Sequence, residues 1–279
     1  MAHPARIVAG VEVVPLCDAV GPMGGGVGRP LGELFGGADQ PAWARLRAVD
    51  AAAADPADTW VLHFHCYLLR DRAGRMVLVD TGVGAVDSPA ATWAPVPGRL
   101  TAELAAVGVG ADEVDVVVLT HLHSDHASGC LTADGAAPAF PNARYLVQGA
   151  ELDWLAAGGS PMFGTVIEPL RKAGCLDVIG DDHGPQTAPG CDIAVVPTPG
   201  HTPGHQSVRV GDHALVVTGD LVLHPVQLAD PALTYRYDED AQAAVAIRTH
   251  LLNQVRAVGG LLAPAHFAEP FVVVPAPAG

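Results

Sequence analysis

The chain alternates between short apolar runs of strand length and longer amphipathic stretches, with glycine and proline between most of them. Apolar runs bounded by such residues predict buried strands, whereas apolar positions that recur every three or four residues predict helices. We expect strands at 7–16, 61–69, 76–80, 114–120, 144–147, 193–197, 206–210, 214–218, 261–264 and 271–274. We expect helices at 41–50, 99–107, 150–157, 165–173 and 240–258. This alternation is typical of the α/β class.

The segment 21–58 departs from the alternating pattern. It contains the glycine-dense run GPMGGGVGRPLGELFGG and the low-complexity run AVDAAAADPAD. Segments of this length between regular elements are often lids or binding loops. We therefore expect a lid or insertion at 21–58, with a plain surface excursion as the alternative. No glycine- or serine-rich linker divides the rest, which predicts a single domain over 1–279.

Composition and charge narrow the class of partner. Among 279 residues, 30 are acidic and 15 are basic, so the formal charge is −15. A surface this negative repels phosphate backbones and anionic lipid, and we expect neither a nucleic-acid nor a membrane partner. The five cysteines are scattered without a CxxC pair, the N-terminus lacks a signal-peptide pattern, and no apolar run approaches the ~20 residues of a membrane span. These features predict a cytoplasmic location.

A dense group of metal-binding residue types follows the predicted strand 114–120. The sequence HLHSDH places His121, His123, Asp125 and His126 within six positions. In an extended or turning backbone, His121 and His123 project to the same side and can share one metal ion. Asp125 and His126 follow at the turn and could serve an adjacent ion. One histidine is often structural, but four ligand types at this spacing predict a metal site.

Three later strands are followed by ligand-type residues in the same way. His201 lies in TPGHTPGH, Asp220 in TGD and His266 in PAH. Strand ends at one rim of a sheet are where open α/β folds collect their binding sites. His205, four residues after His201, is interpreted as a packing residue or a support for a ligand.

These motifs, together with VDTGVG at 79–84, closely resemble the metallo-β-lactamase superfamily of dinuclear metallohydrolases. They run from Asp80 to His266, about two thirds of the chain. The resemblance implies a four-layer αβ/βα sandwich with two divalent metal ions at the rim between the sheets. It implies that the first ion is held by His121, His123 and His201, the second by Asp125, His126 and His266, and that Asp220 bridges them.

The implied chemistry is hydrolysis by a hydroxide that bridges the two ions and attacks an ester carbonyl. Asp125 or Asp220 could shuttle the proton. Imidazole and carboxylate ligands suit Zn²⁺, which we expect, but also iron or manganese. His224, four residues after Asp220, is a further catalytic candidate, with packing as an equal alternative.

Details of the motifs separate branches of the superfamily. True β-lactamases usually carry cysteine or serine where this chain has Asp220, which resembles instead the branch of thioester hydrolases, quorum-signal lactonases and organophosphate hydrolases. A glyoxalase-type thioester hydrolase binds its anionic substrate with basic side chains near the C-terminus. Here only Arg248 and Arg256 occur there, inside a predicted helix. This departure disfavours the thioester alternative.

The run TPGHTPGHQS resembles the acyl-homoserine lactonases. These enzymes commonly carry an oxyanion-assisting tyrosine three residues after the bridging aspartate, where this chain has Leu223. Tyr235, Tyr237 or His224 could replace it. The segment 223–231 resembles the methyl-parathion-hydrolase-like branch, which leaves an organophosphate triester substrate as an alternative.

We therefore expect a metal-dependent hydrolase of a lactone or carboxylic ester, as in quorum quenching, with a neutral or apolar small-molecule substrate. A non-catalytic metal-binding module is the remaining alternative, and a homodimer is left open. His63 and His65 share one face of a predicted strand and are interpreted as core or surface histidines, with a face that lines the cleft as the alternative. The aromatic candidates for the acyl-side wall, each with core packing as the alternative, are Phe35, Trp43, Trp60, Trp93 and Phe163.

Overall fold

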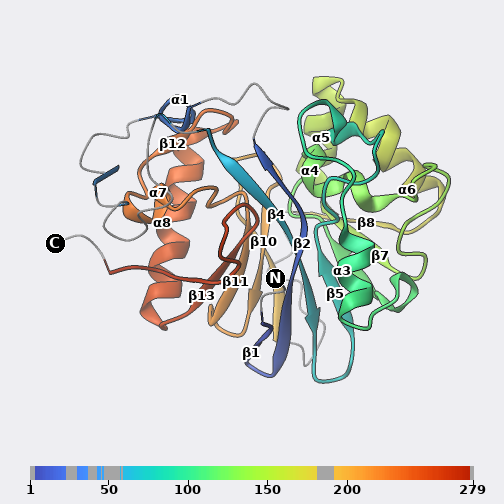
Figure 1. Ribbon diagram of the computed structural model, residues 1–279, viewed down its shortest axis with the longest axis horizontal. Coiled ribbons are helices and arrows are strands. Elements are labelled where there is room, and N and C mark those ends of the chain that lie inside the picture. Colours follow the sequence, from blue (N-terminus) through green and yellow to red (C-terminus); the bar gives the residue numbers. More distant parts are fainter. Residues whose placement is uncertain are drawn as a thin grey trace.

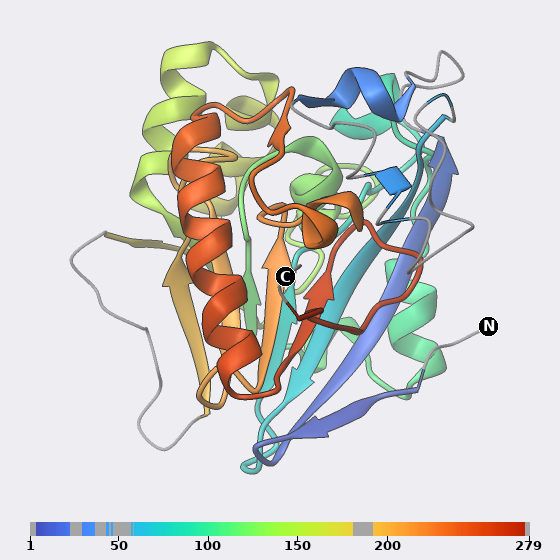
Figure 2. The same ribbon diagram turned by 90° about the vertical axis from the view of Figure 1, so that its left-hand side faces the viewer.

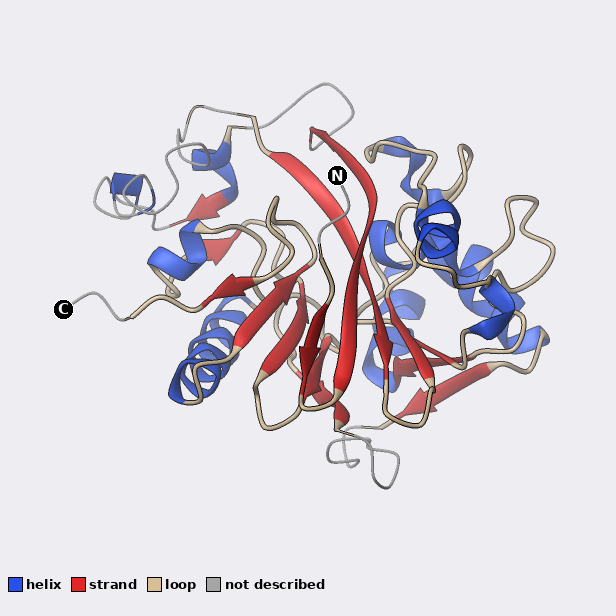
Figure 3. Ribbon diagram, turned by 60° about the horizontal axis from the view of Figure 1, so that its bottom comes forward, coloured by secondary structure: helices blue, strands red, loops and turns tan. Residues whose placement is uncertain are grey.

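The structure, a computed structural model, describes residues 4–22, 30–36, 43, 44, 46, 57, 59–180 and 192–276. Two sheets face each other, and helices cover the outer face of each, as Figures 1 and 3 show. The expected four-layer α/β sandwich is thereby confirmed. Most of the predicted helix at 41–50 and much of the predicted lid at 21–58 lie outside the described residues.

The first sheet has seven strands in the order β1-β2-β4-β5-β6-β7-β8. They are β1 (Arg6–Val8), β2 (Val11–Pro22), β4 (Val61–Arg70), β5 (Met76–Val79), β6 (Val116–Val118), β7 (Arg144–Gln148) and β8 (Leu176–Ile179). The strands β5 to β8 are parallel and the others pair antiparallel. The prediction of one strand over 7–16 is wrong, because Ala9 and Gly10, both at positive φ, form a tight turn that makes it a hairpin.

Helices cover the outer face of the seven-stranded sheet, on the right of Figure 1. They are α3 (Leu100–Ala106), α4 (Ser124–Ala127), α5 (Gly149–Gly158) and α6 (Glu168–Lys172), with single turns η1 (Pro89–Thr92), η2 (Ala111–Glu113), η3 (Ser128–Cys130) and the π-type turn η4 (Phe163–Ile167). Side chains such as Leu68, Leu104, Val117 and Leu170 are almost completely buried between helices and sheet. Burial of this apolar surface at about 25 cal/mol per Å² stabilises the layer.

The second sheet has five strands in the order β14-β13-β11-β10-β9. They are β9 (Ile193–Pro197), β10 (Gln206–Val210), β11 (Leu215–Gly219), β13 (Leu261–Pro264) and β14 (Val272–Val273). The long helix α8 (Ala241–Ala257) packs on its outer face, in front in Figure 2, through Leu251, Leu252 and Val255. None of the helices in the described part of the chain has the length and apolar character that a membrane-spanning helix requires.

The described parts of the segment 21–58 pack beside the sheets. They include α1 (Leu31–Leu34) and β3 (Phe35–Gly36), which pairs with β12 (Thr234–Tyr235). Phe35, Trp43 and Trp60 share one apolar cluster, and the short helix α7 (Val226–Ala229) packs against it through Val226. These contacts connect the described parts of the segment to the chain that follows Asp220.

Hydrogen bonds link the two sheets at the rim where the motif-bearing loops lie. The backbone N–H of Gln206 donates to the carbonyl of Thr120 (2.8 Å), and its side-chain amide donates to the carbonyl of Leu119 (2.7 Å). On the other side the N–H of His65 donates to the carbonyl of Ala265 (2.9 Å). Because β5, β6, β9, β11 and β13 end here, the loops that carry the motifs are brought together.

Candidate metal centre

The first group of donor atoms comes from three loops. Nδ1 of His123 lies 3.0 Å from Nε2 of His121 and 3.0 Å from Nε2 of His201. Oδ2 of Asp220 lies 3.2 Å from Nε2 of His201 and 3.7 Å from Nε2 of His121. These four donor atoms can all face one ion.

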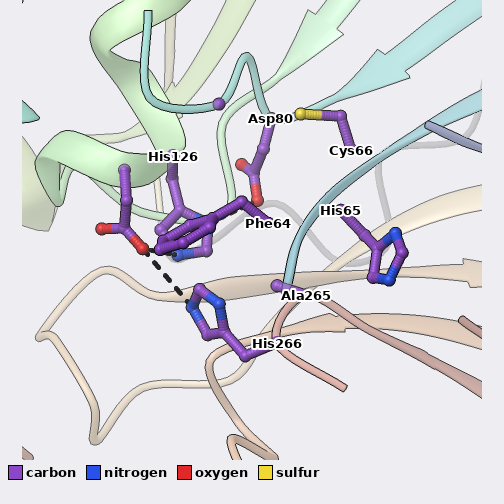
Figure 4. Close-up of a pocket in the computed structure, with 9 residues that line it drawn as sticks. Phe64, His65, Cys66, Asp80, His126, Ala265 and His266 are labelled. Atoms are coloured by element: carbon purple, nitrogen blue, oxygen red, sulfur yellow. Dashed lines mark hydrogen bonds and ion pairs between the residues drawn. The ribbon is translucent and has the colours of Figure 1, made fainter. Parts of the chain in front are cut away.

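The second group lies beside the first. Nε2 of His126 is 3.2 Å from Oδ2 of Asp125, and Nε2 of His266 is 3.4 Å from the same oxygen. Oδ1 of Asp220 lies 3.2 Å from Nε2 of His126 and 3.1 Å from Nε2 of His266. Figure 4 shows His126 and His266 approaching each other from opposite sides, His126 from the short helix α4 that follows β6 and His266 from the loop after β13.

The spacing of both groups fits a metal ion. Four donors about 2.0–2.1 Å from a tetrahedral zinc ion lie about 3.3 Å from one another. The separations given above run from 3.0 to 3.7 Å, and the donor atoms of His121, His123, His201 and Asp220, like those of Asp125, His126 and His266, all lie within 4.8 Å of one another. Nε2 of His126 and Oδ1 of Asp220 are buried and lie 3.2 Å apart, yet neither atom makes a hydrogen bond of acceptable geometry within the described residues. Buried polar atoms normally have partners, so these two fit the role of ligand atoms.

Ring orientation is fixed by hydrogen bonds on the far side of the imidazoles. Metal-binding histidines characteristically use their second nitrogen in this way. The pairs, each joined through Nδ1 of the histidine, are His121 with Oγ1 of Thr120 (3.1 Å), His201 with Oδ1 of Asp238 (3.0 Å), His126 with Oδ2 of Asp80 (2.8 Å) and His266 with the carbonyl of His63 (2.9 Å).

The electrostatics of the cluster also suit a cation. Burial favours the neutral form of His126, but the charges of Asp125 and Asp220 raise its pKa well above the usual value. Burial likewise opposes ionisation of Asp220, yet the charges of His126 and His266 hold its pKa well below its usual range. The pKa of His123 falls to about 3, through burial and then the charge of His201. A divalent ion would supply the positive charge that the carboxylates otherwise draw from protonated imidazoles.

A buried carboxylate that the sequence analysis did not single out supports two of the ligand loops. Oε2 of Glu151, on α5, accepts the N–H of Leu122 (3.0 Å), and Oε1 accepts the N–H of Gly204 (2.9 Å). Burial raises the pKa of Glu151, and these hydrogen bonds oppose the rise. The sequence signal for Glu151 is an acidic residue within the apolar face of a helix. Its partners could be recognised only in the folded chain.

His205 supports the site rather than joining either donor group. Its Nδ1 lies 2.9 Å from Oγ1 of Thr198, and its Nε2 accepts the backbone N–H of Asp220 (3.0 Å). Gly219 precedes Asp220 at positive φ, and an added Cβ there would lie 2.8 Å from Nε2 of His205. The ring therefore fixes the position from which the Asp220 carboxylate projects.

His224 and Leu223 occupy an apolar environment. Nδ1 of His224 accepts the N–H of Val226 (3.2 Å), and burial lowers its pKa to about 3, so the ring is neutral. Its ring lies 5.4 Å from Phe35 and 5.6 Å from Trp60. The catalytic role expected for His224 stays a prediction. Leu223 is buried in the same cluster.

Of the two tyrosines, Tyr235 lies nearer the donor groups. Its ring centroid is 6.0 Å from that of His201. Burial raises its pKa well above the usual value, and the negative charges of Asp220 and Asp125 raise it further. The Tyr237 ring packs on Tyr235, 5.5 Å away, and is 42% exposed. Only Tyr235 therefore combines burial with proximity to the ligands.

A cavity of about 930 Å³ opens beside His266. Its largely apolar lining includes Trp60, His224, Leu228, Phe267 and Phe271. Two of the other aromatic candidates do not line this cavity. Trp93 donates to Oγ of Ser124 (3.0 Å), within the HLHSDH motif, and packs against the cluster of Phe35 and Trp60. Phe163 packs in the helix layer beneath Arg171.

Arg248 does not provide a binding site for an anion. It is completely buried in α8, and its guanidinium donates to the carbonyls of Leu221, Pro231 and Leu233. Burial lowers its pKa to about 10. Its N–H groups donate to backbone carbonyls of the loop that follows Asp220, so Arg248 offers no donor to an anionic thioester substrate.

Comparison with known proteins gives related sequences and folds. N-acyl homoserine lactonase AttM of Rhizobium radiobacter is 35% identical over 114 residues, which are 39% of this chain and 40% of that protein. An N-acyl homoserine lactonase of Bacillus sp is 30% identical over 168 residues, 56% of this chain and 61% of that protein. The matched regions thus span less than two thirds of these relatives.

Two solved structures share the whole architecture. Hydrolase AbOPH of the beta lactamase superfamily superposes with a TM-score of 0.75 at 20% identity, covering 100% of this chain and 98% of that one. AidC, a dizinc quorum-quenching lactonase in complex with a product, superposes with a TM-score of 0.72 at 18% identity, covering 99% and 98%. The family model of the metallo-beta-lactamase superfamily matches residues 59–266. This chain therefore belongs to the metallo-beta-lactamase superfamily.

Proposed function

We propose that this protein is a dinuclear metal-dependent hydrolase that opens the ester bond of a lactone, with N-acyl homoserine lactones as its substrates. The observation that carries the proposal is the Asp220 carboxylate, which directs one oxygen to each donor group. The relatives named N-acyl homoserine lactonase support the substrate class.

We further propose that the seven side chains of the two groups are metal ligands and that the ions are zinc. Imidazole nitrogen and carboxylate oxygen at tetrahedral spacing suit Zn²⁺. Iron and manganese accept the same donors, so elemental analysis of the purified protein is the measurement that separates them. The AidC structure, described as dizinc, supports the choice of zinc.

When bound, two divalent ions supply a Lewis acid for the substrate carbonyl and a water of lowered pKa. The chain's own residues orient the ligands and accept a proton. Asp238 and Asp80 orient the imidazoles of His201 and His126. The carboxylate of Asp125 lies at the second group and can accept a proton there.

Tyr235 is the residue that we propose in place of the tyrosine missing at Leu223. The phenol is buried, so it stays protonated and can donate a hydrogen bond to the oxyanion that develops on the carbonyl. It reaches the site from β12, downstream of the position where the lactonases carry theirs.

Tyr235→Phe is expected to lower kcat/KM for the lactone about tenfold, the equivalent of the ~1.4 kcal/mol typical of one hydrogen bond. Two metal ions should still bind, because no donor atom is removed. Tyr237→Phe is the matched control and should leave the kinetics unchanged. Equal losses in both variants, or none in Tyr235→Phe, would contradict the assignment.

The cavity beside His266 supports a neutral substrate with an apolar chain. Its lining by Trp60, Leu228 and Phe267 offers apolar surface next to the donor groups. Binding sites for small molecules are commonly apolar clefts with a few polar groups at one end.

The function is tested with a panel of one N-acyl homoserine lactone, one aryl ester, one thioester and one phosphotriester. We expect the highest kcat/KM for the lactone, loss of turnover after chelation, and recovery when Zn²⁺ is returned. A higher kcat/KM for the phosphotriester would replace the lactonase proposal by the organophosphate alternative. Two bound ions without turnover of any substrate would indicate a non-catalytic metal-binding module.

A further inference from the structure

A separate group of donor residues lies on the neighbouring strands β2 and β4. Cys17 is the register partner of His65, and His63 precedes His65 by two positions, so the two imidazoles share one face of the strand. One potential ligand atom from each of the three lies within 4.8 Å of the other two. Among the groups of three or more potential ligands in the described part of the chain, this is the one that contains a thiol.

The local backbone suits convergence of these side chains. The His63 and His65 rings are stacked, with centroids 5.7 Å apart and planes inclined by 18°. The register between β2 and β4 shifts between Cys17 and Ala19, and such a bulge redirects a side chain at the edge of a sheet.

A carbonyl determines which nitrogen of His65 carries the proton. Nε2 lies 3.0 Å from the carbonyl oxygen of Phe267, which can only accept, so Nε2–H donates and Nδ1 keeps its lone pair. This is the arrangement seen at His266, whose Nδ1 donates to the carbonyl of His63. A histidine held in this way is oriented to bind a metal through its other nitrogen.

The group is distinct from the dinuclear centre. Figure 4 shows the ring of His65 turned away from His126 and His266, whereas Phe64, its neighbour on β4, points toward them. The Phe64 ring lies 5.3 Å from that of His266. Successive side chains of a strand project to opposite faces, so β4 separates the two groups.

We propose that Cys17, His63 and His65 form a third metal site, which binds Zn²⁺ or a similar thiol-seeking divalent ion through one thiolate and two imidazoles. A fourth position would be left for water. Zinc accepts mixed sulfur and nitrogen donors, and soft thiolate selects against Mg²⁺ and Ca²⁺.

Binding at this site would release the thiol proton of Cys17 to solvent. Burial raises the pKa of this thiol, and the nearby Arg99 opposes the rise, so the ion has to displace a proton. A bound ion would cross-link β2 to β4 beside the His63 carbonyl that supports His266. The proposal does not depend on hydrolase activity.

Cobalt substitution tests the third site without using activity as the readout. The seven proposed ligands of the dinuclear centre include no cysteine, so Co²⁺ bound there gives no thiolate-to-cobalt charge-transfer absorption in the near ultraviolet. When metal-free protein is titrated with Co²⁺, we expect that absorption to rise with a third equivalent of bound cobalt. Zn²⁺ added afterwards should remove it.

Variants make the assignment specific. Cys17→Ser should lose the near-ultraviolet absorption and the third equivalent while keeping the first two equivalents and its hydrolytic rate. Cys175→Ser is the matched control, since Cys175 is also half-buried but belongs to no donor group within the described residues, and it should keep the absorption. His63→Gln provides a second variant and should weaken the third binding step. The proposal is overturned if saturating cobalt gives no such absorption, or if the absorption survives in Cys17→Ser or is unchanged in His63→Gln.

Discussion

Asp220→Asn is expected to lower kcat/KM by about 10³-fold, the upper range for loss of one group that stabilises developing charge, and to reduce the metal content below two ions per chain. The reason is geometric. One carboxylate oxygen of Asp220 faces His201 and the other faces His126, so a single side chain serves both donor groups. An amide keeps one acceptor, presents an N–H₂ group to the other ion and carries no negative charge.

The measurement for Asp220→Asn is elemental analysis together with steady-state kinetics on the lactone. Asp212→Asn is the matched control, because its side chain is 89% exposed and its ion-pair partners among the described residues, Arg209 and His213, are close to it in sequence. The control should retain two ions and full turnover. Two tightly bound ions and undiminished kcat/KM in Asp220→Asn would contradict the bridging role.

The donor residues could be identified from sequence because their signals are local. His121, His123 and Asp125 occur within a few positions after an apolar run, and the chemistry of their side chains is visible without the fold. His201 and Asp220 follow other apolar runs in the same manner. The structure brings all seven predicted donors together because the strands that precede them end at one rim.

The residues that support the donor groups could not be identified from local sequence signals. Glu151 reaches backbone N–H groups of Leu122 and Gly204, and Asp238 reaches His201 from 37 positions away. Each depends on a pairing that exists only after the layers have packed. A charged residue within an apolar helix face is the one local sign that Glu151 gave.

The errors in secondary structure have a similar origin. The run 7–16 contains one charged residue, Glu12, among mostly apolar ones, so periodicity alone does not reveal the turn at Ala9 and Gly10. The strands β3 and β12 were not predicted, because two residues carry too few positions for a periodic signal. The strand β8 was not predicted either, and Asp177 interrupts its apolar run. By contrast, β9, β10 and β13 were predicted with the observed bounds.

Asp80→Asn is expected to weaken binding of the second ion by about 10–100-fold, the usual effect of losing a hydrogen bond behind a metal-binding histidine. Oδ2 of Asp80 accepts from Nδ1 of His126 and from Oγ1 of Thr120, both at 2.8 Å, and Oδ1 accepts the N–H of Thr120 at 2.8 Å. An asparagine side chain would place its NH₂ group, which is itself a donor, opposite one of these donors. The backbone of Asp80 has a φ of +61°, which asparagine tolerates as well as aspartate, so the effect belongs to the side chain.

Asp238→Asn is the matched variant for the other donor group, since Oδ1 of Asp238 orients His201 at 3.0 Å. Competition titrations with a chelator should then separate the two variants. Asp80→Asn should lose the ion at Asp125, His126 and His266 first, whereas Asp238→Asn should lose the ion at His121, His123 and His201 first. Because a buried acceptor left unsatisfied costs about 1–3 kcal/mol, urea unfolding of both metal-free variants measures the accompanying loss of stability and keeps it apart from metal affinity. If both variants lost the two ions in the same order as the wild type, these carboxylates would be supporting the fold and not the individual metal sites.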